Sequence, residues 1–247
     1  MNKKVIVCDL DGTLAPSKSP LESNMAELIC KIISKHRMAV ISGGSYKQFQ
    51  KQFLSQLKCT GDVFKNIYLF PTNGSTCYVY DGKNDFKQVY DEKLSTDEVK
   101  EIFSAFRKAI IESLVDVSNP YGELIEDRGG QVSFSGRGQD APLEVKEKWD
   151  PDQKKRQSII SILKIYIPDF EIRVGGATTI DVTHKGITKA YAIKKIEQIL
   201  NVRTNEMVFY GDALFDGGND SEVRKTGVES ISVSGPAETY ELLKKYA

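Results

Sequence analysis

The chain has little of several features that mark particular classes of protein. Its 34 basic and 34 acidic residues give a formal net charge of zero, so it lacks the basic excess with which proteins bind nucleic acid or acidic membrane surfaces. No apolar run approaches the ~20 residues that span a bilayer. The apolar run Val5–Cys8 is too short for a signal peptide. We therefore predict a soluble, cytoplasmic protein with neither nucleic acid nor membrane as a partner.

Cysteine and histidine are also scarce. The four cysteines have no C-x-x-C spacing, and we expect them to be small, reduced, buried residues. The histidines, His36 and His184, lie far apart and show no metal-ligand pattern. There is no Walker A motif and no dinucleotide-binding glycine motif, so the sequence gives no support for nucleotide binding.

Both ends of the chain alternate between apolar strands and amphipathic helices. The 247 residues are 40% hydrophobic, enough for one large domain or two small ones. Continuous apolar runs at 5–8, 38–41 and 67–70 are typical of parallel strands that are covered on both faces. Helical spacing at 22–35 and 48–57 separates them. The pattern predicts an α/β fold, a doubly wound, Rossmann-like parallel sheet.

The middle of the chain has a different pattern. A hairpin flanks Asp81–Asn84, a capping box at Ser95–Glu98 begins a helix, and Asp150 with Pro151 is expected to begin another. Short strands complete an antiparallel sheet. After residue 186 a helix (188–200) and a strand (207–210) return to the α/β pattern. We predict a core of residues 1–81 and 186–247 with an inserted α+β domain of residues 82–185, joined by linkers at 81–84 and 184–186.

Polar residues follow three of the predicted parallel strands. They are Asp9-Leu10-Asp11-Gly12-Thr13, Ser42-Gly43-Gly44 and Gly211-Asp212. The carboxyl ends of such strands meet at one edge of the sheet, where ligands bind. Gathered carboxylates repel one another unless they hold a hard cation such as Mg²⁺, which would also neutralise a phosphate and leave one carboxylate free to attack it. The glycines allow phosphate oxygens to approach backbone N–H groups.

The motif D-x-D-G-T directly after an N-terminal strand resembles that of the haloacid dehalogenase superfamily of aspartate-nucleophile phosphotransferases. The superfamily's other motifs follow in order: Ser42 after the second strand, Lys189, and Gly211-Asp212 with Gly217-Gly218-Asn219-Asp220. The resemblance implies that Asp9 is the nucleophile and that Asp11 is the general acid and base. It also implies that Ser42 and Lys189 stabilise the transferring phosphoryl group.

The same resemblance implies a Mg²⁺ ion held by Asp9, the backbone carbonyl of Asp11, and Asp212. Asn219 and Asp220 would orient Lys189 and the metal ligands. Asp216 offers an alternative reading of the last motif, although a solvated loop carboxylate is the simpler interpretation.

The place and length of the insertion resemble the type-two (C2b) cap of eukaryotic-type phosphomannomutases. Gly175–Val182 resembles a cap segment that binds sugar hydroxyls, and 124–129 with Gly136-Arg137 resembles the strands that present arginines to a second phosphate. The resemblance implies a hexose phosphate substrate, a hexose 1,6-bisphosphate activator and a homodimer formed through the caps. The implied substrate-binding residues are Gly12, Gly43, Gly44, Lys18, Arg128, Arg137, Thr179, Asp181 and Asn219.

Two departures from that family leave the reaction open. Lys18 stands where the family has an arginine. A lysine keeps the positive charge but cannot bind a phosphate through two parallel N–H groups. A third cap arginine has no clear counterpart, and only Lys146 lies near its position. We therefore expect either a mutase that converts mannose 1-phosphate to mannose 6-phosphate or a sugar-phosphate phosphatase on the same scaffold. A non-catalytic sugar-phosphate sensor is the remote third hypothesis.

Overall fold

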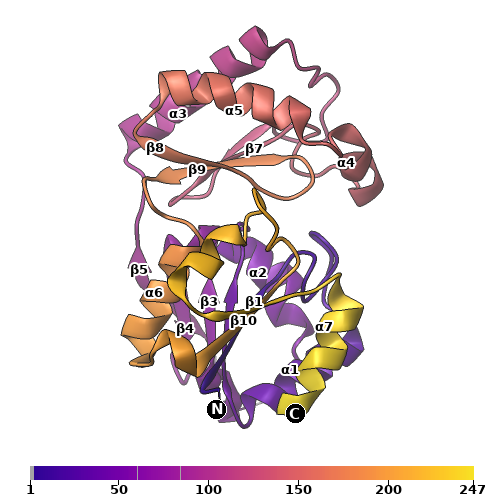
Figure 1. Cartoon of the computed structure of the whole chain (residues 1–247), viewed down its shortest axis with the longest axis vertical. Coiled ribbons are helices and arrows are strands. Elements are labelled where there is room, and N and C mark those ends of the chain that lie inside the picture. The colour runs from indigo at the N-terminus through magenta and orange to yellow at the C-terminus, as the bar shows by residue number, and fades with distance from the viewer. Residues whose placement is uncertain (1–2, 60, 84) are drawn as a thin grey trace. The chain divides into compact units, whose positions relative to one another are not determined.

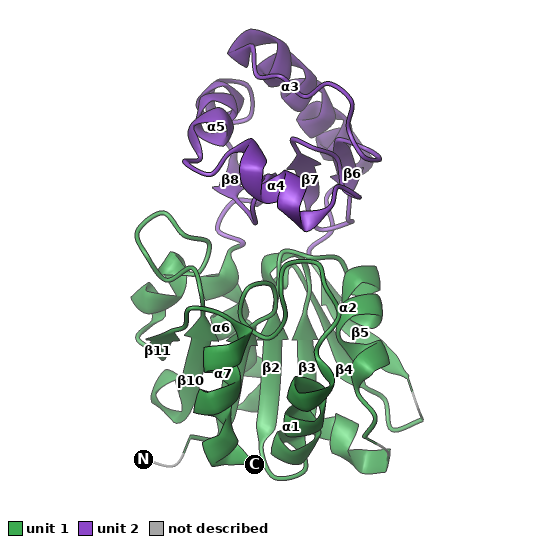
Figure 2. Cartoon of the chain, turned by 90° about the vertical axis from the view of Figure 1, so that its right-hand side faces the viewer, with its two compact units in different colours: residues 1–91, 188–247 green, residues 92–187 purple. Residues whose placement is uncertain are grey.

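The computed structural model describes residues 3–59, 61–83 and 85–247. It divides the chain into two compact units, residues 1–91 with 188–247 and residues 92–187 (Figure 2). Within the described residues, no helix is both long enough and apolar enough to cross a membrane.

The first unit is built on a seven-stranded sheet with the order β11-β10-β1-β2-β3-β4-β5. Strands β1, β3, β4, β5 and β10 of this sheet are labelled in Figure 1. The first five strands of that order are parallel, β4 pairs antiparallel with β3, and β5 pairs antiparallel with β4. The strands are β1 (Val5–Asp9), β2 (Arg37–Ile41), β3 (Ile67–Phe70), β4 (Thr76–Tyr80), β5 (Phe86–Asp91), β10 (Met207–Gly211) and β11 (Glu229–Ser232). The helices are α1 (Ser23–Ile33), α2 (Tyr46–Gln52), α6 (Lys189–Leu200) and α7 (Pro236–Leu243). Short 3₁₀ turns are η1 (Leu54–Gln56), η2 (Gly61–Asn66), η3 (Thr72–Gly74), η4 (Thr204–Glu206), η5 (Ser221–Thr226) and η6 (Lys244–Tyr246).

Helices cover both faces of this sheet because successive strand residues point to opposite sides. In β1, Ile6 and Cys8 pack into one apolar cluster with α1, α2 and α7. Val5 and Val7 pack into a second cluster with α6. The predicted doubly wound α/β core is confirmed.

The second unit is a four-stranded antiparallel sheet with the order β6-β7-β9-β8. Its elements are α3 (Thr96–Ser113), β6 (Ile125–Asp127), β7 (Val132–Ser135), α4 (Leu143–Trp149), α5 (Lys154–Tyr166), β8 (Phe170–Val174) and β9 (Thr179–His184). The Ser95–Glu98 capping box begins α3 as predicted. Phe134 and Ile180 face α3 and α5 in one apolar core, so their neighbours on β7 and β9 point to the opposite face.

The unit boundaries differ from the predicted ones. The structure divides the chain after Asp91 and before Thr188, whereas the sequence suggested breaks at 81/82 and 185/186. The physical reason is that β5 pairs with β4 and so extends the core sheet. Asn84, part of the predicted linker, lies outside the described residues.

Two local predictions are wrong. Asp150 accepts hydrogen bonds from the backbone N–H groups of Lys155 and Arg156, but the helix begins at Lys154, so Pro151 is not its first residue. Cys30 and Cys59 are not free thiols, because they form a disulfide with a Cα–Cα distance of 5.5 Å, in the range that disulfides span. Cys8 and Cys77 are free and buried.

Candidate active site

Three segments far apart in the sequence meet at the carboxyl edge of the core sheet. Asp9 is the last residue of β1, Ser42 follows β2, and Asp212 follows β10. These strands are neighbours in the sheet order β10-β1-β2. The parallel topology therefore brings the polar residues together at one edge.

A buried lysine lies among carboxylates at this edge. Nζ of Lys189, the first residue of α6, lies 2.6 Å from Oδ1 of Asp9 and 2.6 Å from Oδ1 of Asp220. The side chains of all three are at most 3% exposed. Asp9, Asp212 and Asp220 each place a carboxylate oxygen within 4.8 Å of the others. One ammonium group thus pairs directly with two carboxylates, and a third carboxylate lies close to them.

Burial sets the electrostatics of this group. It raises the pKa of Asp9 well above its ordinary value, and the carboxylates of Asp220 and Asp212 raise it further, while Lys189 opposes the shift. Burial also raises the pKa of Asp212. For Lys189 burial acts to lower the pKa, but the carboxylates of Asp220 and Asp9 outweigh it and the pKa is raised. A further cation would stabilise the ionised forms of Asp9 and Asp212 and so oppose the upward shifts of their pKa values.

The donor set at this edge fits a hard divalent cation. It contains only oxygen ligands, the class that Mg²⁺ prefers. Oδ1 of Asn219 is buried and, among the described residues, accepts no hydrogen bond. Gly12 has φ +85°, and a Cβ on it would lie 2.5 Å from Oδ2 of Asp212. The backbone therefore approaches the carboxylate as closely as only glycine allows.

Thr13 fixes the orientation of Asp212. Its hydroxyl donates to Oδ1 of Asp212 over 3.2 Å and accepts from the backbone N–H of Asp212 over 3.1 Å. The side chain of Thr13 is completely buried. Thr13 lies within the D-x-D-G-T motif, but the sequence alone does not indicate this role, because the partner of Thr13 lies 199 residues away.

Asp11 lies apart from the acidic group. Among the described residues, the group of carboxylates that could hold a metal ion contains Asp220 and not the side chain of Asp11. Oδ1 of Asp11 accepts from the backbone N–H of Lys18 over 2.6 Å, and Oδ2 accepts from Oγ of Ser42 over 3.2 Å. Gln48 and Gln52 of α2 also donate to this carboxylate, and sequence reasoning missed both.

The turn after β2 is compact around Ser42. Oγ of Ser42, a buried residue, accepts from the backbone N–H of Gly44 over 3.0 Å. Gly43, between them, is half-buried.

Asp216, in the loop after β10, is exposed. Asp216 is not part of the acidic group among the described residues, in agreement with its interpretation as a solvated loop carboxylate.

The second unit carries a polar face on its sheet. Asp181 lies opposite Ser133 across β7 and β9, and Oγ of Ser133 donates to Oδ1 of Asp181 over 2.6 Å. Two residues along β9, Thr179 is also buried. A Cβ on Gly175 would lie 2.1 Å from Oγ1 of Thr179 and 2.9 Å from Oδ2 of Asp181, which shows that both side chains lie on one face.

The side-chain amide of Gln139 connects Arg128 to this polar face. Its Nε donates to Oε2 of Glu126 over 2.7 Å and its Nη2 to Oε1 of Gln139 over 3.0 Å. Nε2 of Gln139 donates in turn to the backbone carbonyl of Ser133 over 3.2 Å. The guanidinium is therefore fixed in direction by an acid and an amide, a preorganised cation.

Arg137 and Lys146 are arranged differently. Nη1 of Arg137 donates to the carbonyl of Ser118, and the residue is half-buried. Lys146 is only 5% exposed, and its Nζ donates to the carbonyl of Gln139 over 2.9 Å. The lysine nearest the absent third arginine thus supports the backbone of the residue that holds Arg128.

Comparison with known families agrees with this geometry. The model of the family described as eukaryotic phosphomannomutase matches residues 25–246. The chain belongs to the eukaryotic phosphomannomutase family. It is 27% identical to the phosphomannomutase of Encephalitozoon cuniculi, over 96% of this chain and 91% of that protein. It is 26% identical to phosphomannomutase 2 of Dictyostelium discoideum, over 99% and 97%.

Solved structures show the same fold in more distant proteins. A C-terminally truncated IMP-nucleotidase of Plasmodium falciparum superposes with a TM-score of 0.74 at 19% identity, over 99% of this chain and 71% of that one. A haloacid dehalogenase-like hydrolase of Bacteroides thetaiotaomicron gives 0.66 at 15% identity, over the full length of both. This eukaryotic phosphomannomutase family member therefore has a haloacid dehalogenase-like fold.

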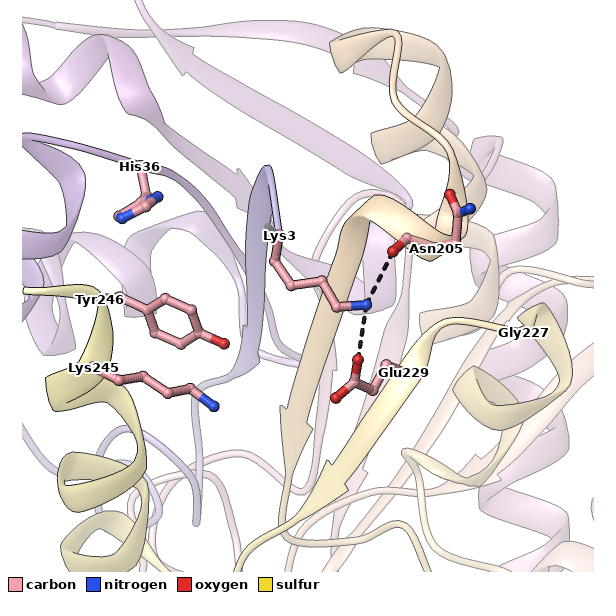
Figure 3. Close-up of a pocket in the computed structure, with 7 residues that line it drawn as sticks. All are labelled: Lys3, His36, Asn205, Gly227, Glu229, Lys245 and Tyr246. Atoms are coloured by element: carbon pink, nitrogen blue, oxygen red, sulfur yellow. Dashed lines mark hydrogen bonds and ion pairs between the residues drawn. The ribbon is translucent and has the colours of Figure 1, made fainter. Parts of the chain in front are cut away.

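A separate hollow of about 780 Å³ lies at the other end of the core sheet. Its walls include Lys3, Glu229 and Tyr246 (Figure 3), and Lys3 and Glu229 lie near the amino ends of β1 and β11. Nζ of Lys3 is engaged by Oε2 of Glu229 at 2.8 Å and by the carbonyl of Asn205 at 3.0 Å. This pocket is thus distinct from the edge at which the carboxylates of this family member gather.

Proposed function

We propose that the chain moves a phosphoryl group between two hydroxyls of a hexose phosphate, converting mannose 1-phosphate to mannose 6-phosphate. The relatives from Encephalitozoon cuniculi and Dictyostelium discoideum are both phosphomannomutases. One observation carries the proposal: Asp9 is buried against Lys189, whereas Asp11, two residues along, keeps its carboxylate outside that group. Two carboxylates in different surroundings suit two roles, nucleophile and proton carrier.

In the first step an oxygen of Asp9 attacks the phosphorus of a hexose 1,6-bisphosphate. The bond from phosphorus to the sugar oxygen breaks, and Asp11 protonates that oxygen as it leaves. In the second step the 6-hydroxyl of mannose 1-phosphate attacks the phosphorus, its proton passes to Asp11, and Asp9 is released. The mannose 1,6-bisphosphate that forms then repeats the first step through its 1-phosphate, which restores the aspartyl phosphate and leaves mannose 6-phosphate. Lys189 and Ser42 donate to the phosphoryl oxygens as charge develops on them.

Asp9, Asp212 and the backbone carbonyl of Asp11 would hold Mg²⁺, with Asp220 and Asn219 beside them. When bound, the ion supplies charge neutralisation for the attacking carboxylate and the phosphate. Its presence would also allow Asp9 and Asp212 to be ionised together despite their raised pKa values.

The residues that we propose for substrate binding include members of both units. Lys18, Asn219 and the backbone of Gly12, Gly43 and Gly44 would bind the transferring phosphoryl group. Arg128 and Arg137 would bind the second phosphate, and Thr179 with Asp181 would bind sugar hydroxyls. The fixed guanidinium of Arg128 supports its part, because charge-assisted bonds to phosphate are directional.

Phosphorus NMR tests this proposal. The purified chain receives Mg²⁺, mannose 1-phosphate and a trace of glucose 1,6-bisphosphate. We expect the mannose 1-phosphate signal to convert to mannose 6-phosphate with little free phosphate, and we expect Asp9→Asn to abolish turnover. Growth of inorganic phosphate alone would instead identify a sugar-phosphate phosphatase. Binding without turnover would identify a sensor.

We also propose a homodimer formed through the second unit, as the resemblance to phosphomannomutases implies. Ile111 and Leu114 at the end of α3 and Ile165 at the end of α5 are 72%, 90% and 76% exposed, an unusual degree for aliphatic side chains. A cytoplasmic location is likewise a proposal, and the Cys30–Cys59 disulfide is the feature that does not favour it.

A further inference from the structure

The carboxylate of Asp11 accepts two hydrogen bonds from the side chains of α2. Nε2 of Gln52 donates to Oδ1 over 3.0 Å, and Nε2 of Gln48 donates to Oδ2 over 3.3 Å. With the backbone N–H of Lys18 on Oδ1 and the hydroxyl of Ser42 on Oδ2, each oxygen has two donors. An ionised carboxylate has about four acceptor sites, so this orientation of Asp11 uses them all.

The two glutamines are held in place by their surroundings. They lie one helical turn apart on α2, and Nε2 of Gln48 also donates to Oε1 of Gln52 over 2.9 Å. This bond directs Nε2 of Gln52 towards Asp11, because the reversed amide would place two nitrogens together. Gln52 is only 3% exposed, and its backbone carbonyl accepts from the backbone N–H of Leu21 over 3.0 Å.

The turn before α2 leaves room for this arrangement. Oγ of Ser45 caps the helix by accepting from the backbone N–H of Gln48. A Cβ on Gly44 would lie 2.6 Å from Oε1 of Gln48, so any larger residue there would displace the amide. The turn therefore serves both the backbone around Ser42 and the glutamine that contacts Asp11.

A carboxylate in this orientation cannot take up a proton without losing a hydrogen bond. Amide N–H donors do not accept protons, so the glutamines only stabilise the resting carboxylate. Asp11 must release at least one of them before it acts as a base. A bound sugar supplies binding free energy that can offset this loss, whereas a single water molecule supplies little.

We propose that Gln48 and Gln52 are positioning residues that hold Asp11 at rest and thereby protect the aspartyl phosphate from water. This inference rests on the proposed function. In the reaction that it suppresses, a water oxygen bonds to phosphorus, the bond from phosphorus to Asp9 breaks, and phosphate leaves while the water proton passes to Asp11. The glutamine pair thus favours transfer to a sugar hydroxyl over hydrolysis.

The test removes each donor while keeping the length of the side chain. Gln48→Met and Gln52→Met are compared with Gln50→Met, a change at an exposed position of the same helix. Each chain is phosphorylated with ³²P-labelled glucose 1,6-bisphosphate and Mg²⁺, and decay of the label is followed without sugar. We expect decay about tenfold faster in each test variant, the effect of losing one hydrogen bond to a charged group, and no change in the control.

The ratio of free phosphate to mannose 6-phosphate is measured in parallel. A purely structural defect would slow transfer and hydrolysis together and leave this ratio unchanged. An unchanged ratio, or slower decay, in the test variants would overturn the inference. If Gln52→Met does not fold, the half-exposed Gln48 decides alone. Failure of the proposed function is distinguished because the unmodified chain would then form either no labelled aspartyl phosphate or free phosphate without any mannose 6-phosphate.

Discussion

Nζ of Lys189 and Oδ1 of Asp220 are 2.6 Å apart in a site where neither side chain is more than 1% exposed. Oδ2 of the same carboxylate accepts from the backbone N–H of Ala213 over 3.1 Å. Asp220 therefore connects the first residue of α6 to the loop after β10, so that its two oxygens position both Lys189 and the segment that carries Asp212.

Asp220→Asn tests this connection. The amide keeps the shape but removes the charge, so Lys189 loses one of its two buried counter-ions. We expect phosphoryl transfer to fall at least a hundredfold and unfolding free energy to fall by about 3 kcal/mol, as when one partner of a buried pair is removed. Activity assays and thermal unfolding measure the two effects. Asp216→Asn, at an exposed site, is the control, and equal behaviour of the two variants would contradict the prediction.

Asp212→Asn should have the opposite effect on the stability of the metal-free chain. Burial raises the pKa of Asp212, so its ionisation disfavours folding: this group stabilises the fold at low pH and loses that contribution as pH rises through the folded pKa. The neutral amide removes this cost at pH 7. We expect a Tm a few degrees higher without Mg²⁺, since 1 kcal/mol is worth about 2–4 °C at this size.

The same variant should lose the stabilisation that Mg²⁺ gives. Thermal scans with and without the ion separate the two effects. A lower Tm without metal would show that hydrogen bonding by Thr13 to Asp212, rather than charge repulsion, dominates at this position.

Binding of Mg²⁺ should release protons. Asp9 and Asp212 both have a raised pKa because of burial, and metal ligands must be deprotonated. Protons therefore compete with the ion at a higher pH than for ordinary aspartates of pKa about 3.9. We expect apparent affinity to fall as pH is lowered, and calorimetry in two buffers of different ionisation enthalpy counts the protons. An affinity independent of pH with no proton release would refute this prediction.

The sequence predicts the core well because its strands are continuous apolar runs that end in polar residues. The predicted strand at 67–70 coincides with β3, and Asp9 and Ser42 lie where the apolar runs of β1 and β2 end. The role of Lys189 is predicted from its motif. A buried lysine requires carboxylate partners, and the structure provides Asp9 and Asp220.

Neutral side chains and distant pairs are harder to predict. Gln48 and Gln52 have the spacing of any amphipathic helix, and their role depends on where the loop after β1 places Asp11. Thr13 depends on a partner from the other end of the chain. The hairpin of β4 and β5 has the same local pattern whether it joins the core sheet or the second unit. Its place follows only from the pairing of β3 with β4.

The Cys30–Cys59 disulfide is another such distant pair. It closes a loop with a sequence separation of 29, and loop-closure entropy then predicts about 3–4 kcal/mol of stabilisation. We expect Cys30→Ser with Cys59→Ser to lower the Tm by about 10 °C. Thiol titration of the unreduced, denatured chain should find only the two free cysteines, Cys8 and Cys77. Four titratable thiols would show that the pair is reduced in solution.

Arg128 gives a prediction about substrate binding by the second unit. Its guanidinium is fixed by Glu126 and Gln139, and in the proposed function it binds the phosphate that is not transferred. Arg128→Met should therefore raise KM for glucose 1,6-bisphosphate at least tenfold, the loss of a charge-assisted hydrogen bond to phosphate. Hydrolysis of p-nitrophenyl phosphate, which has no second phosphate, should keep its kcat and KM. Arg107→Met, at an exposed position on α3, is the matched control in the same unit. An unchanged KM for the bisphosphate would mean that Arg128 only supports the polar face of the sheet, whereas an equal loss with both substrates would indicate a folding defect.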